Sequence, residues 1–306
     1  MIISVSRRTD IPAFYSDWFM NRVREGYAIV RNPIYPGKVM HADLSPGTVD
    51  AFVFLTRNPG PFLNHIEELE NRGYRFCFQM TITGYPKLLE PNVISLNEAV
   101  RLFHELSNRI GPEKIIWRFD PVVLSTLTTE DYIFETFAQI ASRLKGATGR
   151  VIISFADYYP KVKINFRQIE EQTGVSFFDL HNDPDRLFRI AARLADIAEN
   201  EHMEIFACAE KMDLSSAGIR KGKCIDDVYL SRILGIPIRA PKARNQRADC
   251  GCVHSLDIGQ YDTCLHDCAY CYATRNLKTA RRNGKKHNPQ SPCLTEITEK
   301  EGSRSE

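Results

Sequence analysis

Continuous runs of apolar residues, rich in β-branched and aromatic side chains, recur along the first two thirds of the chain. Polar residues follow each run closely, and the runs themselves show no alternation of apolar and polar positions. Such runs are typical of strands buried on both faces of a parallel sheet. The pattern predicts six strands, at Ile2–Val5, Ala51–Leu55, Phe76–Ile82, Ile115–Phe119, Val151–Phe155 and Met203–Ala207.

Between these strands, apolar residues recur at helical spacing. The stripes run through Leu63–Leu69, Val100–Ile110, Phe134–Leu144 and Leu187–Ile197, and the last opens at Asp183-Pro184-Asp185, a helix-start signal. Strands that alternate with helices predict right-handed β–α–β units around a parallel sheet. No G-x-G-x-x-G turn follows any strand, so a dinucleotide-binding sheet is not indicated. We expect an α/β fold, a (β/α) TIM-type barrel or partial barrel.

Composition narrows the class of protein. The 306 residues are 43% apolar and 25% charged, which is ordinary for a globular chain. The net charge of 40 − 38 = +2 is too small to indicate a nucleic-acid partner by itself. No run approaches 18 apolar residues and the start, MIISVSRRTD, does not resemble a signal peptide. We therefore expect a cytoplasmic protein that does not enter the membrane.

Cysteine is unevenly distributed. Three of the nine cysteines precede residue 250, and five fall between residues 250 and 271. We expect residues 1–210 to form the barrel core, residues 211–288 to be a cysteine-rich segment that completes the barrel, and residues 289–306 to be a disordered polar tail. In a cytosolic protein, grouped cysteines indicate metal binding or catalysis before disulfides.

Polar residues at the ends of the predicted strands are candidates for a site. In a parallel barrel these residues emerge at the carboxyl edge, where active sites are built. The catalytic candidates are Glu210, Arg118 and Asp120, and Arg7 and Asp157 are candidates for cofactor binding. The alternative is that these strand ends are polar only because they meet water, with Glu210 paired to a neighbour such as Lys211.

The most informative motif is Cys264-Leu-His-Asp-Cys268-Ala-Tyr-Cys271-Tyr-Ala. Three thiolates on one short loop can hold three corners of a cubane and leave one iron without a protein ligand. With Tyr270 before the last cysteine, this C-x3-C-x2-C segment resembles the signature of radical S-adenosylmethionine (SAM) enzymes. Its Cys-Ala-Tyr-Cys-Tyr-Ala sequence is similar to that of the spore photoproduct lyase branch. The resemblance implies a [4Fe–4S] cluster on Cys264, Cys268 and Cys271, with Tyr270 as a cofactor-binding residue. It also implies SAM on the fourth iron and reductive cleavage to a 5′-deoxyadenosyl radical.

A wider resemblance covers nearly the whole chain. Ser6-Arg-Arg-Thr-Asp-Ile-Pro, Leu55-Thr-Arg-Asn-Pro, Trp117-Arg-Phe-Asp-Pro and the cysteine loop together resemble an uncharacterised bacterial family, domain of unknown function 1848. In radical SAM enzymes the motif follows the first barrel strand, whereas here it lies near the carboxyl end. A circular permutation explains the difference if Val253–Ile258 takes the place of that strand and Ala273–Arg281 that of its helix. The glycine-rich SAM motif of that superfamily is not recognisable.

Four further cysteines form a second set, comprising Cys208, Cys224, Cys250 and Cys252. Four thiolates suit a second iron–sulfur cluster or a zinc site. The alternative is that Cys208 and Cys224 are small buried apolar residues, as free cysteines usually are. Cys77 lies within a predicted strand and is expected in the core.

The expected function is radical SAM chemistry on an unknown small-molecule or nucleic-acid substrate, with an electron donor such as a ferredoxin or flavodoxin. The alternative is a zinc or iron–sulfur protein that recognises nucleic acid and cleaves no SAM. In that case Cys268 and Cys271 would form a zinc pair completed by Cys264, His266 or His254. The basic run Arg275–Lys286 would then bind phosphates, although such runs are more often solvated helix faces.

Overall fold

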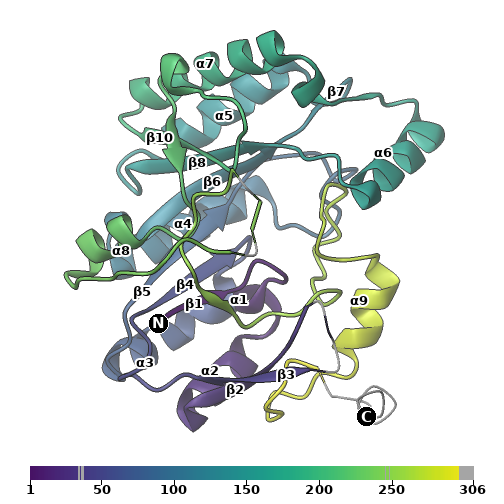
Figure 1. Ribbon diagram of the computed structural model, residues 1–306. Helices are drawn as coiled ribbons and strands as arrows, with labels where there is room; N and C mark the ends of the chain where they lie inside the picture. Colours follow the sequence, from purple (N-terminus) through teal and green to yellow (C-terminus); the bar gives the residue numbers. More distant parts are fainter. Residues whose placement is uncertain (34, 36–37, 245, 248, 296–306) are drawn as a thin grey trace. The chain divides into compact units, whose positions relative to one another are not determined.

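The buried apolar runs form the strands of one large sheet in the computed structural model (Figure 1). The structure describes residues 1–33, 35, 38–244, 246–247 and 249–295. The strand order is β11-β10-β8-β6-β5-β4-β1-β12. The strands are β1 Ile2–Val5, β4 Ala51–Thr56, β5 Phe76–Thr81, β6 Ile115–Val122, β8 Arg150–Phe155, β10 Glu204–Cys208, β11 Arg220–Gly222 and β12 Leu256–Asp257.

The expected mixed α/β architecture is confirmed, but among the residues that the structure describes the sheet does not close into a barrel. Strand β1 pairs in parallel with β4 and β12, and β8 pairs in parallel with β6 and β10. In the part of the chain that the structure describes, no pairing joins the two outermost strands, β11 and β12. These strands have three and two residues, so they offer few backbone groups for closure. The predicted strand Val253–Ile258 is the shorter β12, and it pairs in parallel with β1.

The chain divides into two units, with the boundary inside β5. Unit 1 comprises residues 1–78, 255–267 and 273–306. Besides its strands it contains α1 Ile11–Phe14, α2 Ser16–Glu25, η1 Gly60–His65, α3 Ile66–Asn71, α9 Leu277–Gly284 and an antiparallel hairpin of β2 Tyr27–Arg31 and β3 Val39–Asp43. Helix α1 begins where the Asp10 side chain accepts the Ala13 N–H at 3.0 Å. The core of unit 1 is aromatic. The Phe19 ring packs on the rings of Phe52 and Phe54, with centroid distances of 5.1 and 5.3 Å.

Unit 2 comprises residues 79–254 and 268–272. Its helices α4 Leu96–Ile110, α5 Glu130–Leu144 and α7 Pro184–Asn200 pack side by side, α4 against α5 and α5 against α7. Their starts are capped by Ser95, Thr129 and Asp183, whose side chains each accept a backbone N–H from the first turn. The remaining elements are α6 Pro160–Thr173, α8 Asp227–Leu234, β7 Leu124–Ser125, β9 Phe177–Phe178, η2 Pro112–Lys114, η3 Leu180–Asn182 and η4 Ser215–Ala217.

The polar tail expected after residue 289 is attached to unit 1 where it is described. Trp18 Nε1 donates to the Ser291 carbonyl at 2.9 Å, and the Ile29 N–H donates to the Pro292 carbonyl at 2.9 Å. The rest of that expectation, residues 296–306, lies outside the described residues. Among the described helices, none combines the length and apolarity that a membrane crossing requires.

Candidate metal centre at the end of strand β10

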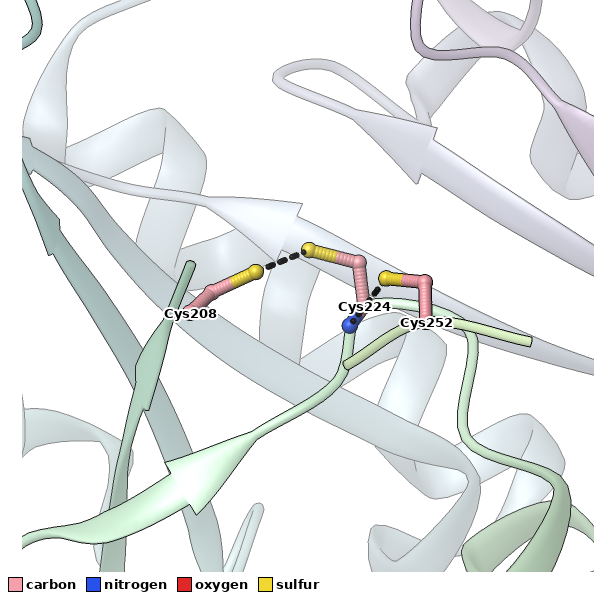
Figure 2. Close-up of side chains that lie close together, drawn as sticks. All are labelled: Cys208, Cys224 and Cys252. Carbon is pink, nitrogen blue, oxygen red and sulfur yellow. Dashed lines mark hydrogen bonds between the residues drawn. The ribbon is translucent and has the colours of Figure 1, made fainter. Parts of the chain in front are cut away.

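Three cysteines from separate parts of unit 2 bring their thiols together (Figure 2). Cys208 is the last residue of β10, and its Cα partner on β11 is Gly222. Cys224 follows β11 by two residues, so the parallel register places it beside Cys208. Cys252 comes from the segment that leads to β12. The three Sγ atoms lie within 4.8 Å of one another, and those of Cys208 and Cys224 are 2.8 Å apart. This group could hold a metal ion.

The surroundings of Cys252 favour its thiolate. Its sulfur accepts the backbone N–H groups of Cys224 at 3.2 Å and Ile225 at 3.4 Å. Hydrogen bonds from the thiols of Cys208 and Cys224 lower the pKa of Cys252 to about 6. The same thiol–thiol contacts, with burial, raise the pKa of Cys208 above its ordinary value. These contacts therefore favour the thiolate of Cys252. The thiolate is the form of cysteine that binds metal.

A buried arginine lies against this sulfur group. Arg118 on β6 donates from Nη1 to Cys224 Sγ at 3.0 Å and to Gln79 Oε1 at 2.7 Å. Its Nη2 donates to the Asp120 carboxylate, which also accepts from Ser154 Oγ. Burial alone would lower the pKa of Arg118, but Asp120 and the thiols of Cys224 and Cys208 raise it. The guanidinium is a fixed positive charge at the metal centre. Two predicted site residues, Arg118 and Asp120, thus lie together with Cys208 and Cys224.

Glu210 lies two residues beyond Cys208 and is buried. Its Oε1 accepts the Phe155 N–H at 2.8 Å, and its Oε2 lies 3.3 Å from His181 Nε2. Its ionic partner is therefore His181 and not Lys211. The hydrogen bond that the Glu210 carboxylate accepts from His181 raises the pKa of His181. Asp157, whose pKa is raised by burial, pairs with Arg247.

The predicted cofactor-binding residue Arg7 belongs to unit 1, where it contacts the largely buried carboxylate of Asp257. Its backbone N–H donates to Asp257 Oδ2 at 2.7 Å, and its side chain donates to Ser255 Oγ at 3.3 Å. In the same unit His266 Nε2 lies 2.8 Å from Asp10 Oδ2, so His266 is a buried hydrogen-bonding residue. These contacts join β12 and the residues after it to the end of β1.

The cysteine loop is divided between the units. Cys264 belongs to unit 1, where the preceding carbonyl, that of Thr263, accepts the Tyr15 hydroxyl at 2.7 Å. Cys268 and Cys271 belong to unit 2, where the Cys271 N–H donates to the Cys268 carbonyl at 3.0 Å. Tyr270 lies between them, and its hydroxyl donates to Glu90. Each part of the loop is thus ordered within its own unit.

Three residues that contact the predicted site residues belong to no sequence motif. Gln79, Ser154 and His181 contact predicted site residues, yet none of them belongs to a motif. Gln79 and Ser154 are polar residues inside apolar strand runs, and that exception is the one sign that could have indicated them. His181 lies in the short turn η3, where the sequence shows no periodicity.

Comparison with known proteins gives a family but no activity. No curated protein matches the sequence. A family model described as "Domain of unknown function (DUF1848)" matches residues 2–273, which includes every residue of the centre and the whole cysteine loop. The resemblance inferred from the four sequence segments is confirmed, and the chain belongs to the DUF1848 family.

Proposed function

We propose that this protein is an iron–sulfur enzyme of the radical SAM type. Cys264, Cys268 and Cys271 would hold a [4Fe–4S] cluster, and SAM would bind the iron that these three thiolates leave open. The observation that carries the proposal is the C-x3-C-x2-C spacing with Tyr270 before its last cysteine. Three cysteines supply one ligand fewer than the four that iron–sulfur clusters normally take. An open metal position is what separates reactive sites from closed structural ones.

The second half of the loop fits the role of a cluster ligand. The hydrogen bond from the Cys271 N–H to the Cys268 carbonyl closes a turn that carries both thiols. Cys268 is buried and Cys271 is partly exposed. The ammonium group of Lys161 donates to the Cys271 carbonyl at 2.9 Å, so a positive charge lies at the turn. A positive charge favours thiolates, which are the form that iron binds.

The two residues between these cysteines fix the turn to unit 2. The Ala269 N–H donates to the Leu89 carbonyl at 2.9 Å, and Asn165 Nδ2 donates to the Ala269 carbonyl at 2.7 Å. Ala269 also packs in a hydrophobic cluster with Leu89 and Phe166, and Tyr270 packs against that cluster. A ligand turn held in this way stays in place when the cluster binds, which lowers the entropic cost of binding.

When bound, the cluster and SAM would supply the one-electron chemistry. The residues of the chain would then orient the substrate and exclude water. In unit 2, His181 would carry a proton, because its partly exposed imidazole contacts the Glu210 carboxylate. The Phe155 N–H holds that carboxylate in place. Arg118 would supply fixed positive charge.

The test is SAM cleavage by anaerobically purified and reduced protein. We expect iron and sulfide in the protein, and 5′-deoxyadenosine and methionine as products detected by chromatography. Replacing Cys264, Cys268 or Cys271 by alanine should abolish the product, because two thiolates do not hold the cubane in place. The matched control is Cys77→Ala, a buried cysteine in β5 outside the loop. A colourless protein that contains zinc, or an iron-loaded protein that cleaves no SAM with any reductant, would refute the proposal.

A further inference from the structure

The separations between the thiols at the end of β10 fit one metal ion better than a cluster. A tetrahedral ion with bonds of about 2.3 Å to sulfur holds neighbouring sulfurs about 3.8 Å apart. In a cubane each thiolate binds a different iron and points outward, so the sulfurs are roughly 6 Å apart. The sulfurs of Cys208, Cys224 and Cys252 all lie within 4.8 Å of one another, and those of Cys208 and Cys224 are closer still, at 2.8 Å. This spacing leaves room for one ion and not for four irons with their sulfides.

The candidate for a fourth sulfur ligand is Cys250. Cys250 is buried and its thiol is hydrogen-bonded with that of Cys252, next to the group of three sulfurs that lie within 4.8 Å of one another. The single residue between them is Gly251, and a side chain there would press on Lys223 Cγ at 3.3 Å, directly beside Cys224. The glycine lets the two-cysteine segment lie close to the backbone that carries Cys224. Four thiolates complete the ligand set of a closed tetrahedral site.

The charges around the sulfurs point the same way. A zinc ion with four thiolates has a formal net charge of about −2, which must be offset when it is buried. Arg118 lies 3.0 Å from Cys224 Sγ, and two backbone N–H groups donate to Cys252 Sγ. Such donors support metal-bound thiolates from outside the coordination sphere. Arg118 is already paired with Asp120, and thiolates at the metal would add a second favourable charge beside its guanidinium.

The segment that carries Cys250 and Cys252 needs such a bond. Residues 235–254 contain no helix or strand at their described positions, which omit 245 and 248. Loops longer than about 15 residues without secondary structure are uncommon in folded domains. The backbone of this segment is tied by an isolated bridge of Lys242 with Val253 and by a hydrogen bond from the Val253 N–H to the Ile225 carbonyl at 3.1 Å, and Cys250 and Cys252 are 6% and 1% exposed. A metal that joins these cysteines to β10 explains how an irregular segment stays buried.

We propose that Cys208, Cys224, Cys250 and Cys252 bind a single zinc ion in a closed tetrahedral site that fastens residues 235–254 to the end of β10. The site differs from the cysteine loop in ligands, in metal and in role. It does not rest on the proposed radical SAM function. Zinc is the divalent ion that suits four thiolates in tetrahedral geometry without redox chemistry.

The test uses the full chain in a background where Cys264, Cys268 and Cys271 are all alanine, which removes the proposed cluster and leaves the zinc ligands unchanged. Anaerobic purification without chelator should give about one zinc per chain and no acid-labile sulfide. Replacement of that zinc by Co²⁺ should give the intense visible bands of a tetrahedral tetrathiolate, a readout that needs no substitution in the site. Adding Cys252→Ser should remove the zinc, and adding Cys77→Ala instead should retain it.

Two results would overturn the proposal. About four irons with sulfide in the loop-free background would mean that the second cysteine set holds a cluster. A metal-free protein with a Cys208–Cys224 disulfide in its peptide map would mean that these cysteines are a redox pair. Neither result depends on whether the intact protein cleaves SAM, so the two proposals fail separately.

Discussion

Asp257→Asn should strongly destabilise the protein, because the Asp257 carboxylate, whose side chain is only 10% exposed, joins β12 to β1. Its Oδ1 accepts from Ser6 Oγ at 2.7 Å, Arg8 Nε at 3.1 Å and the Gly259 N–H at 2.9 Å. Its Oδ2 accepts from Ser4 Oγ at 3.2 Å and the Arg7 N–H at 2.7 Å. Every lone pair of the side chain therefore has a donor. The substitution keeps the shape of the side chain and changes only its charge and one acceptor.

The magnitude follows from those contacts. If the asparagine oxygen takes the Oδ1 position, its NH₂ group faces the Arg7 N–H, and two donors meet without an acceptor. An unsatisfied buried donor costs about 1–3 kcal/mol. Arg8, whose side chain is 9% exposed, also loses its ionic partner. Breaking a buried ion pair by removing one member costs about 3–5 kcal/mol. These two effects overlap, so we expect a loss of about 3–5 kcal/mol in the free energy of unfolding.

The assay is urea unfolding of both proteins under anaerobic conditions across a pH series. Burial raises the pKa of Asp257, but Arg8 and Arg7 outweigh it and hold the pKa below its usual range. The stabilisation by the carboxylate is therefore complete above the unfolded pKa of about 3.9, and it is lost as the pH falls through the lower folded pKa. The difference between wild type and Asp257→Asn should be constant above about pH 5 and shrink below pH 3.9.

The matched control is Asp50→Asn, in the same unit. Asp50 pairs with the Met1 amino group at 2.8 Å, but it is 51% exposed. An exposed pair contributes about 0–1 kcal/mol. If the two variants lose the same stability, or if the Asp257→Asn difference does not change with pH, burial of the carboxylate is not what stabilises this joint.

Two further changes test unit 2. Arg150→Met should lower the free energy of unfolding by about 3 kcal/mol. The substitution leaves the partly buried Asp226 without the guanidinium 3.2 Å away and removes a cation from the face of the Phe206 ring. A loss under about 1 kcal/mol in urea unfolding would contradict this expectation. His181→Gln should lower stability more at pH 5.5 than at pH 9. The Glu210 contact raises the pKa of His181, so its contribution is full below the unfolded pKa of about 6.5 and is lost as the pH rises through the folded pKa. Equal effects at both pH values would show that the contact is not ionic.

The strands were predictable because burial on both faces leaves an unmistakable pattern. Ile2–Val5 forms β1 as predicted, and Ile115–Phe119 starts β6, which extends to Val122. The hairpin of β2 and β3 was not predicted, because each strand has only five residues, the first three residues of β3 are exposed, and no Asn-Gly or Asp-Gly turn joins the strands. Closure of the sheet depends on β11 and β12, whose pairing is short and leaves little trace in local sequence.

The cysteines of the candidate metal centre could be predicted from the sequence, but the residues that surround them could not. Cysteine has few roles in such a chain, so removing the C-x3-C-x2-C motif left a small set that contains Cys208, Cys224 and Cys252. The approach of Arg118 to Cys224 depends on the order of β6, β8, β10 and β11 in the sheet. Neighbours set by sheet order are far apart in sequence, so local patterns do not show them. The contact between His181 and Glu210 has the same origin, since it joins a turn to a strand end.

The pairing of β12 with β1 has a consequence for synthesis of the protein. Ile3 pairs with Leu256, which is 256 − 3 = 253 residues later in the chain. At a translation rate of about 5–20 residues per second, the partner of Ile3 is made about 13–50 s after it. Until then one edge of β1 has open backbone donors and acceptors beside apolar side chains, a combination that invites aggregation. A gene rearranged so that residues 255–295 are translated before residue 1 would remove that delay, and its product should depend less on chaperones during expression.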